Sequence, residues 1–337
     1  MLYRCIQKLL FGLEAEKAHS IALNSLNWLA ALRLNFLFKQ PKARPIELLG
    51  LKFNNPVGLA AGLDKDAKYL SGLNMLGFGF IEIGSIPPKP QPGNPKPRLF
   101  RLTPHEALIN RFGFNSEGMA AALLRLKKHK FNGVLGVSIT QNNATPYEDS
   151  VKDYVACFNQ VYPYADFISV NVSCPNVTIE RSFQEVEHLS ELVSALKTAQ
   201  KQQQASCKKY VPMLVKLPPD MDETHLQHVV HVLKKFHVDG VISCNTSKQR
   251  TAVESHALAK QVGGLSGAPI FSKSLSQIKL LRQMLGAEFP IIAVGGITSK
   301  ENAEKMFAAG ANLVQIYTGL IYHGPKLIRQ ICELKAR

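Results

Sequence analysis

The chain has 337 residues, 46% of them hydrophobic, and a formal net charge of +15. Its length suits two average domains or one large α/β barrel with an addition. A net positive charge attracts nucleic acid, anionic lipid or small anions. The basic residues are widely spread, however, and no aromatic–basic module occurs, so we expect no nucleic-acid binding. The six cysteines form no CxxC pair, which argues against a zinc site or a disulfide framework and favours a reduced cytosolic chain.

The first 45 residues have the hydrophobic periodicity of amphipathic helices. Gly12, followed by Glu14 and Glu16, marks a break between two helices. Residues 1–48 carry seven Lys and Arg against three acidic residues, which is typical of a membrane-surface element. A helical cap packed on the following domain is the other interpretation, and the two are compatible. No run approaches the ~20 apolar residues needed to span a bilayer.

After a linker at 39–45, short apolar runs of β type alternate with longer segments of helical character. The runs lie at 56–61, 80–85, 133–139, 167–172, 213–217, 240–245, 290–296 and 313–318. Such alternation indicates a parallel sheet covered by helices, and eight units predict an α/β fold of the closed (β/α)8 type, a TIM barrel. An open doubly wound sheet usually has fewer strands and an early GxGxxG motif, which is missing. We therefore expect an N-terminal helical segment over 1–45 and a barrel over 46–337.

Polar residues gather at the ends of these predicted strands. They are Asp64, Lys65, Ser85, Ser138, Asn171, Lys216, Asn245, Gly295, Gly296, Tyr317 and Thr318. Packing alone requires no amide or ammonium there, and burying either without a partner costs several kcal/mol. In (β/α)8 barrels the chemistry is located at the carboxyl ends of the strands. The pattern predicts one shared polar site at that mouth.

Two segments lie between the predicted strands in the first half of the barrel. Residues 88–102 contain five prolines, which predict a stiff excursion over the barrel mouth. Residues 109–118 present asparagines and an arginine around a glycine, a composition that suits either substrate contact or an ordinary loop.

Glycine-rich motifs occur in the last three β–α units, at 263–267, 294–297 and 317–319. The loops after strands seven and eight of this fold commonly bind phosphate through backbone N–H groups, and glycine allows close approach. We predict a phosphate-bearing cofactor; tight packing at the rim is the alternative.

Cys174 lies just beyond a predicted strand end, before Pro175 and between Asn171 and Asn176. A cysteine is usually a small buried hydrophobe, but at this place a thiolate can accept a proton while the amides bind a planar polar substrate. The sequence has no HExxH motif and no clustered His or carboxylate residues, so we expect no metal site.

Several motifs occur in the order found in the dihydroorotate dehydrogenase family. They are GLAAGLDKD, KPQPGNPKPRLFRL, INRFGFN, NVSCPN, CNTS, GGLSG, VGGI and VQIYTG. The sequence resembles that family over essentially its whole length. The N-terminal helices resemble its membrane-associated, quinone-using class 2, which implies a peripheral protein on the cytoplasmic face of the inner cell membrane, bound to an anionic surface and expected to be a monomer.

The resemblance implies an FMN-containing barrel that oxidises dihydroorotate to orotate in pyrimidine synthesis. The implied cofactor-binding residues are Ala61, Gly62, Lys65, Ser85, Ser138, Asn171, Lys216, Cys244, Gly267, Gly296, Tyr317 and Thr318. The implied substrate-binding residues are Lys65, Asn110, Arg111, Phe112, Gly113, Phe114, Asn171, Asn176, Asn245 and Thr246. Cys174 takes the position of the catalytic base. Electrons would leave to ubiquinone or menaquinone through a slot lined by residues such as Leu9, Leu13 and His19.

Some residues depart from the family pattern. The quinone-using class ordinarily has serine as the base, whereas cysteine is typical of the soluble class, which uses fumarate or NAD. Ser138 stands where an asparagine is usual, and the segment after Cys174 lacks the common Thr-Pro-Gly. A soluble-class enzyme and a non-catalytic flavin-binding barrel on a membrane surface are therefore the alternative interpretations.

Overall fold

The computed structural model describes residues 2–128, 131, 133–172 and 186–334. At its centre, eight parallel strands form a closed barrel, as predicted, and follow one another around it in chain order. They are β3 (Val57–Leu59), β4 (Phe80–Ile86), β7 (Val134–Ile139), β8 (Phe167–Asn171), β9 (Met213–Leu217), β10 (Gly240–Ser243), β12 (Ile291–Val294) and β13 (Leu313–Ile316). Each corresponds to one of the eight apolar runs. Their side chains are buried throughout, because helices cover the outside and side chains fill the inside.

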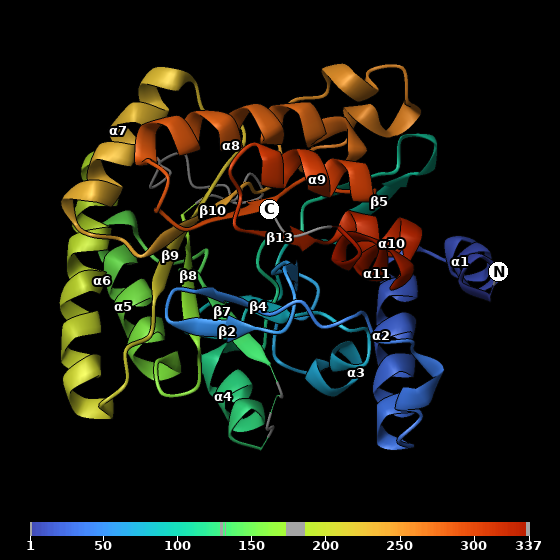
Figure 1. Ribbon diagram of the computed structural model, residues 1–337, viewed down its shortest axis with the longest axis horizontal. Coiled ribbons are helices and arrows are strands. Elements are labelled where there is room, and N and C mark those ends of the chain that lie inside the picture. The colour runs from blue at the N-terminus through green and yellow to red at the C-terminus, as the bar shows by residue number, and fades with distance from the viewer. Residues whose placement is uncertain (1, 129–130, 132, 173–185, 335–337) are drawn as a thin grey trace.

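Helices surround this barrel (Figure 1). They are α3 (Leu70–Asn74), α4 (Gly118–Lys128), α5 (Ser150–Val161), α6 (Val186–Cys207), α7 (Glu223–Lys235), α8 (Phe271–Leu285), α9 (Lys300–Ala308), α10 (Thr318–His323) and α11 (Lys326–Cys332). Their apolar faces form one continuous core with the outward side chains of the strands. The starts of α7 and α9 are capped by Asp222 and Ser299, whose side chains accept hydrogen bonds from backbone N–H groups of the first turn.

A hairpin of β1 (Ile46–Leu48) and β2 (Leu51–Phe53) packs on the amino-terminal end of the barrel. The ring of Phe53 contacts that of Phe80 edge-on, with the centroids 5.2 Å apart. Phe80 in turn lies against Gly58 of the neighbouring strand, where a Cβ atom would overlap its ring. This end of the barrel is therefore filled with apolar side chains, and polar groups are left to the opposite end.

A second sheet lies at the carboxyl-terminal mouth. It is antiparallel, in the order β11 (Gly264–Gly267), β6 (Ala107–Asn110), β5 (Leu99–Leu102). The sequence predicted a proline-stiffened excursion here but no sheet. The prolines precede β5, and the last residues of the excursion form that strand. The sheet covers one side of the barrel mouth.

The N-terminal segment forms α1 (Leu2–Phe11) and α2 (Ala15–Ala31), with the break at the predicted place. Glu14 caps α2 by accepting hydrogen bonds from two backbone N–H groups at its start. Asn27 of α2 donates to the carbonyl oxygen of Lys68 at 2.7 Å, and Tyr3 of α1 donates to that of Ile321 at 2.8 Å. Both helices are therefore packed on the barrel, at one side of it (Figure 1).

The outer face of this helical segment exposes large apolar side chains. Leu9, Trp28 and Phe36 are 76%, 73% and 78% exposed. Over the described part of the chain, none of the helices combines the length and the apolar character that a membrane span requires.

Candidate active site

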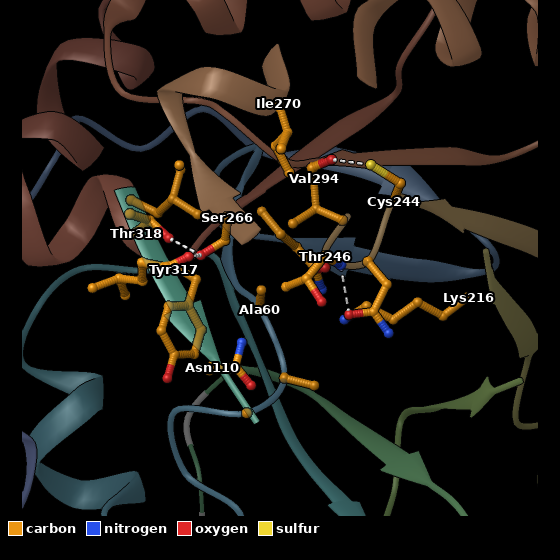
Figure 2. Close-up of a pocket in the computed structure, with 18 of the residues that line it drawn as sticks. Ala60, Asn110, Lys216, Cys244, Thr246, Ser266, Ile270, Val294, Tyr317 and Thr318 are labelled. Atoms are coloured by element: carbon orange, nitrogen blue, oxygen red, sulfur yellow. Dashed lines mark hydrogen bonds between the residues drawn. The ribbon is translucent and has the colours of Figure 1, made fainter. Parts of the chain in front are cut away.

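A cavity opens at the carboxyl ends of the barrel strands, and residues of β5, β6 and β11 are part of its lining. Figure 2 shows 18 of the lining residues. The empty volume of the cavity, part of which is open to solvent, is about 1080 Å³. It is lined by most residues that the sequence assigned to cofactor and substrate: Ala61, Gly62, Lys65, Ser85, Asn110, Phe112, Gly113, Phe114, Asn171, Lys216, Cys244, Asn245, Thr246, Gly267, Gly296, Tyr317 and Thr318. Residues far apart in the chain thus meet at one mouth, as the strand-end pattern predicts.

One end of the cavity is formed by the glycine-rich loops. Gly267, Gly295 and Gly296 all have positive φ values, of 98°, 110° and 74°. A Cβ atom at Gly267 would overlap the carbonyl oxygen of Glu106, and one at Gly296 would press on the backbone of Phe271. Glycine is therefore required by both the backbone conformation and the available space.

Hydroxyl groups lie beside these glycines. Ser266 and Thr318 are joined by a hydrogen bond of 2.9 Å between their hydroxyl oxygens, visible in Figure 2. Thr318 begins α10, immediately after β13. Small residues, hydroxyls and the loops after strands seven and eight together fit a phosphate group.

A chain of hydrogen bonds crosses the strand ends at the opposite side. The hydroxyls of Ser138 and Ser85 lie 2.8 Å apart. Asn171 Nδ2 donates to Ser85 Oγ at 2.8 Å, and Asn245 Nδ2 donates to Asn171 Oδ1 at 3.2 Å. Asn245 Oδ1 accepts from the backbone N–H of Thr246. This chain fixes the orientation of both amides, which suits recognition of a planar polar ring.

A cation lies at the edge of the cavity nearest the N-terminal helices. The Lys65 ammonium is 3.9 Å from the centroid of the Phe112 ring, a cation–π contact. Burial is the main cause that lowers the pKa of Lys65 to about 8, and the charge of Arg98 lowers it further against the opposing carboxylates of Glu16, Asp66 and Asp64. The lysine is therefore mostly protonated at neutral pH and attracts an anionic substrate.

A second, apolar cavity lies between α1, α2 and the barrel. Leu9, Leu10, Ala18, His19, Ala22 and Leu29 are among its lining residues. Burial first, and then the charge of Lys65, lowers the pKa of His19 to about 4, so this imidazole is neutral at physiological pH. Leu13, predicted to line a quinone slot, is not in this lining, whereas Leu9 and His19 are.

Three residues line both cavities: Leu99 of β5, Leu108 of β6, and Tyr317 between β13 and α10. The two spaces therefore share a wall of only these side chains among the described residues. Burial raises the pKa of Tyr317 well above its ordinary value, so its phenol stays protonated.

Not every predicted residue reaches the main cavity. Arg111 does not line it; its guanidinium donates to Gln261 Oε1 at 2.8 Å and to the carbonyl oxygen of Pro97 at 2.9 Å. Ser138 lies one hydrogen bond behind the lining, through Ser85. Cys174 and Asn176 lie outside the described residues.

Cys244, which the resemblance implies as a cofactor-binding residue, lines the cavity and is buried, at 2% exposure. Its Sγ lies 3.0 Å from the hydroxyl of Ser274. Burial raises the pKa of this thiol to about 12, so it is not a nucleophile at neutral pH.

Sequence reasoning missed a polar group inside the barrel. The carboxylate of Glu82 is fully buried beside Lys216, Gln315 and Ser169. All four residues lie within the apolar runs of the sequence. The one signal for a buried polar group was the presence of an acid or an amide, Glu82 or Gln315, inside such a run.

Fold and site together define a (β/α)8-barrel enzyme with a cavity for a phosphate-bearing cofactor and a planar polar substrate. A sequence profile of the dihydroorotate dehydrogenase family matches residues 45–336. The chain belongs to this family.

Relatives in that family match over nearly the full length. The chain is 46% identical to the dihydroorotate dehydrogenase (quinone) of Chromobacterium violaceum, with 100% of this chain and 98% of the relative aligned. It is 46% identical to the protein of the same name from Vibrio parahaemolyticus, with 99% of each aligned. The crystal structure of ligand-free dihydroorotate dehydrogenase from Eimeria tenella superimposes with a TM-score of 0.85 at 34% identity, covering 93% of this chain and 92% of that one.

Proposed function

We propose that this protein is a quinone-dependent dihydroorotate dehydrogenase, which oxidises dihydroorotate to orotate in pyrimidine biosynthesis and passes the electrons through FMN to a quinone. The observation that carries the quinone assignment is the wall of Leu99, Leu108 and Tyr317, which separates the polar cavity from the apolar one. Relatives 44–47% identical over the full chain are named dihydroorotate dehydrogenase (quinone).

The residues of the polar cavity fit FMN. Gly267, Gly296 and Thr318 would bind its phosphate, where glycine backbone and a hydroxyl come together. Lys216 and Ala61 would lie along the ring system. When bound, FMN supplies a hydride acceptor that can afterwards be reoxidised by a quinone.

The chain's own residues bind and orient the substrate. Asn171 and Asn245, with their amides fixed by the hydrogen-bond chain from Ser85, would bind the ring of dihydroorotate. Lys65 would attract its carboxylate, since the ammonium is the cation at this edge of the cavity. Asn110, at the end of β6, and Phe112, just beyond it, would contact the other side of the substrate ring.

Cys174 is the proposed base that removes a proton from a ring carbon of dihydroorotate. Its place in the NVSCPN motif, three residues after Asn171, supports this role. A thiol has an ordinary pKa of about 8.5 and yields a thiolate far more readily than a serine hydroxyl yields an alkoxide. The proton leaves one ring carbon and a hydride leaves its neighbour, so the reaction needs a base for the proton and a separate acceptor, which bound FMN would supply, for the hydride.

The apolar cavity is the proposed entrance for ubiquinone or menaquinone. Its lining of leucines and alanines suits an isoprenoid quinone, and the neutral His19 adds no buried charge. We further propose peripheral binding at the cytoplasmic face of the inner membrane. The exposed Leu9, Trp28 and Phe36 would enter the lipid interface, with the exposed Lys8 and Arg33 near anionic headgroups.

Steady-state turnover of the purified protein tests the function and its class. Dihydroorotate oxidation should be supported by a soluble ubiquinone analogue and not by fumarate or NAD. Turnover with fumarate alone would favour the soluble class, to which the cysteine points. An FMN-containing protein without turnover on any acceptor would favour a non-catalytic barrel.

A further inference from the structure

The interior of the barrel contains a fully buried carboxylate directly behind the cofactor cavity. Glu82, on β4, is 0% exposed. It accepts hydrogen bonds from the Ser169 hydroxyl, from Gln315 Nε2 at 2.7 Å and from the backbone N–H of Ala61 at 3.4 Å. These donors come from three other places around the barrel: β8, β13 and the turn after β3.

A cation completes this group. Lys216 Nζ, on β9, lies 3.7 Å from Glu82 Oε2, and the lysine side chain is only 6% exposed. The Glu82 carboxylate is thus surrounded by donors only: an ammonium, an amide N–H₂, a hydroxyl and a backbone N–H. Glu82 and Lys216 form an ion pair of opposite charges that is buried inside the barrel.

The lysine and the glutamate differ in their access to the cavity. Lys216 and Gln315 line it, and Figure 2 shows the Lys216 side chain reaching toward its interior. Glu82 does not line it. The glutamate therefore acts on anything in the cavity through the lysine and through its own electric field.

We propose that Glu82 is a positioning residue, which fixes the Lys216 ammonium at the wall of the cofactor cavity and would lower the reduction potential of bound FMN by offsetting that positive charge. This inference rests on the proposed function, since it takes FMN as the occupant of the cavity. Reduction places negative charge on the flavin, and an uncompensated ammonium in a buried site stabilises that charge more than a neutralised one does. Glu82 thus keeps the reduced flavin a good donor to the quinone.

The test is the midpoint potential of bound FMN, measured by equilibration with a reference dye in the holoenzyme. Glu82→Gln keeps the shape and removes the charge, so the potential should become more positive. We expect the ratio of reduced to oxidised flavin at a fixed potential to rise at least about tenfold, which is about 30 mV for a two-electron couple. A merely structural role of Glu82 would not move this quantity in a defined direction.

The chain provides a matched control. Asp239, just before β10, forms a pair with Lys197 at the same separation of 3.7 Å, but it contacts the amino-terminal start of β9 through the N–H of Met213. Asp239→Asn should leave the flavin potential unchanged. An equal positive shift in this variant would show that the effect is not specific to Glu82.

A second variant covers the case in which Glu82→Gln does not retain FMN. Glu82→Asp keeps the charge but withdraws it from Lys216, so a smaller positive shift is expected. An unchanged or more negative potential in either variant would overturn the proposal, and so would loss of FMN from both. Failure of the proposed function is separate: it would appear in the wild type, as a protein that binds no FMN or whose flavin dihydroorotate does not reduce.

Discussion

Arg98, just before β5, forms a two-pronged ion pair with Glu16 of α2, with Nε–Oε2 and Nη2–Oε1 distances of 3.1 and 2.8 Å. Both side chains are largely buried, at 8% and 12% exposure. The same guanidinium also donates to the carbonyl oxygens of Pro92 and Asn94. One arginine therefore joins the N-terminal helices to the proline-rich segment that leads into the sheet over the cofactor cavity.

Replacing Glu16 by Gln should lower the free energy of unfolding by roughly 1.5–3 kcal/mol at pH 7, the usual range for a hydrogen bond to a charged group. The matched control is Glu117→Gln, whose ion pairs with Lys68 and Arg125 are half exposed and should contribute less than about 1 kcal/mol. Urea unfolding of the three proteins measures both differences.

The same pair has a defined pH dependence. Burial acts to raise the pKa of Glu16, but the hydrogen bond and charge of Arg98, with Lys96, outweigh it and lower the pKa below its ordinary value. A lowered carboxyl pKa gives stability that is complete above the unfolded-state value of about 4.3 and is lost as the pH falls through the folded-state value. The difference between wild type and Glu16→Gln should shrink below about pH 4; a constant difference down to pH 3 would contradict this.

Filling the apolar cavity should affect quinone use and leave the dihydroorotate half-reaction unchanged. Ala22 of α2 lines this cavity, and Ala22→Phe would place a ring in it. We expect kcat/KM for a ubiquinone analogue to fall about tenfold, equivalent to about 1.4 kcal/mol, with flavin reduction by dihydroorotate unaltered. Ala31→Phe, on the exposed end of the same helix, is the control. Equal losses in both variants would argue against quinone entry here.

Orotate affinity should decrease at alkaline pH. Lys65 is protonated below a pKa of about 8, and a bound carboxylate raises that pKa, so binding takes up a proton above it. The dissociation constant should therefore rise by up to about tenfold per pH unit above about pH 8. Titration of the flavin spectrum with orotate between pH 6 and 10 measures this; a flat profile would exclude Lys65 as the carboxylate partner.

Cys174 offers a direct test of the proposed base. Cys174→Ala should slow flavin reduction by dihydroorotate roughly 100- to 10,000-fold, the usual contribution of a general base, and FMN should remain bound. Cys174→Ser should retain activity with its pH profile shifted to higher pH, since the hydroxyl is the weaker acid. Stopped-flow reduction across pH 6–10 distinguishes these results; full activity of the alanine variant would exclude the cysteine as the base.

The barrel could be predicted from the sequence because its evidence is local. Each strand is a short Val/Ile/Leu run, and a polar residue such as Asn171 or Lys216 at the end of a run indicates the mouth. The predicted limits of the strands agree less well with the structure: the first run, predicted at 56–61, forms a strand only at Val57–Leu59. The residues beyond it leave the sheet to form the cavity wall.

The second sheet and the polar group inside the barrel could not be predicted, because they depend on pairings between distant segments. β6 pairs with its neighbour β5 and also with β11, which lies about 150 residues further along the chain. The sequence of β6 contains no pattern that predicts the pairing with β11. Gln315 and Glu82 are 233 positions apart. Arg111 belongs to a motif whose other residues, such as Asn110 and Phe112, line the cavity, yet its own side chain binds Gln261 instead. Such relationships follow from the tertiary fold and not from local composition.

The most direct test of the account is an anaerobic flavin spectrum of the purified protein, taken before and after dihydroorotate and again after a ubiquinone analogue. We expect an FMN spectrum that dihydroorotate bleaches and the quinone restores. A bleached flavin that recovers with fumarate and not with quinone would contradict the role given to the apolar cavity. An FMN spectrum that dihydroorotate leaves unchanged would contradict the proposed reaction itself.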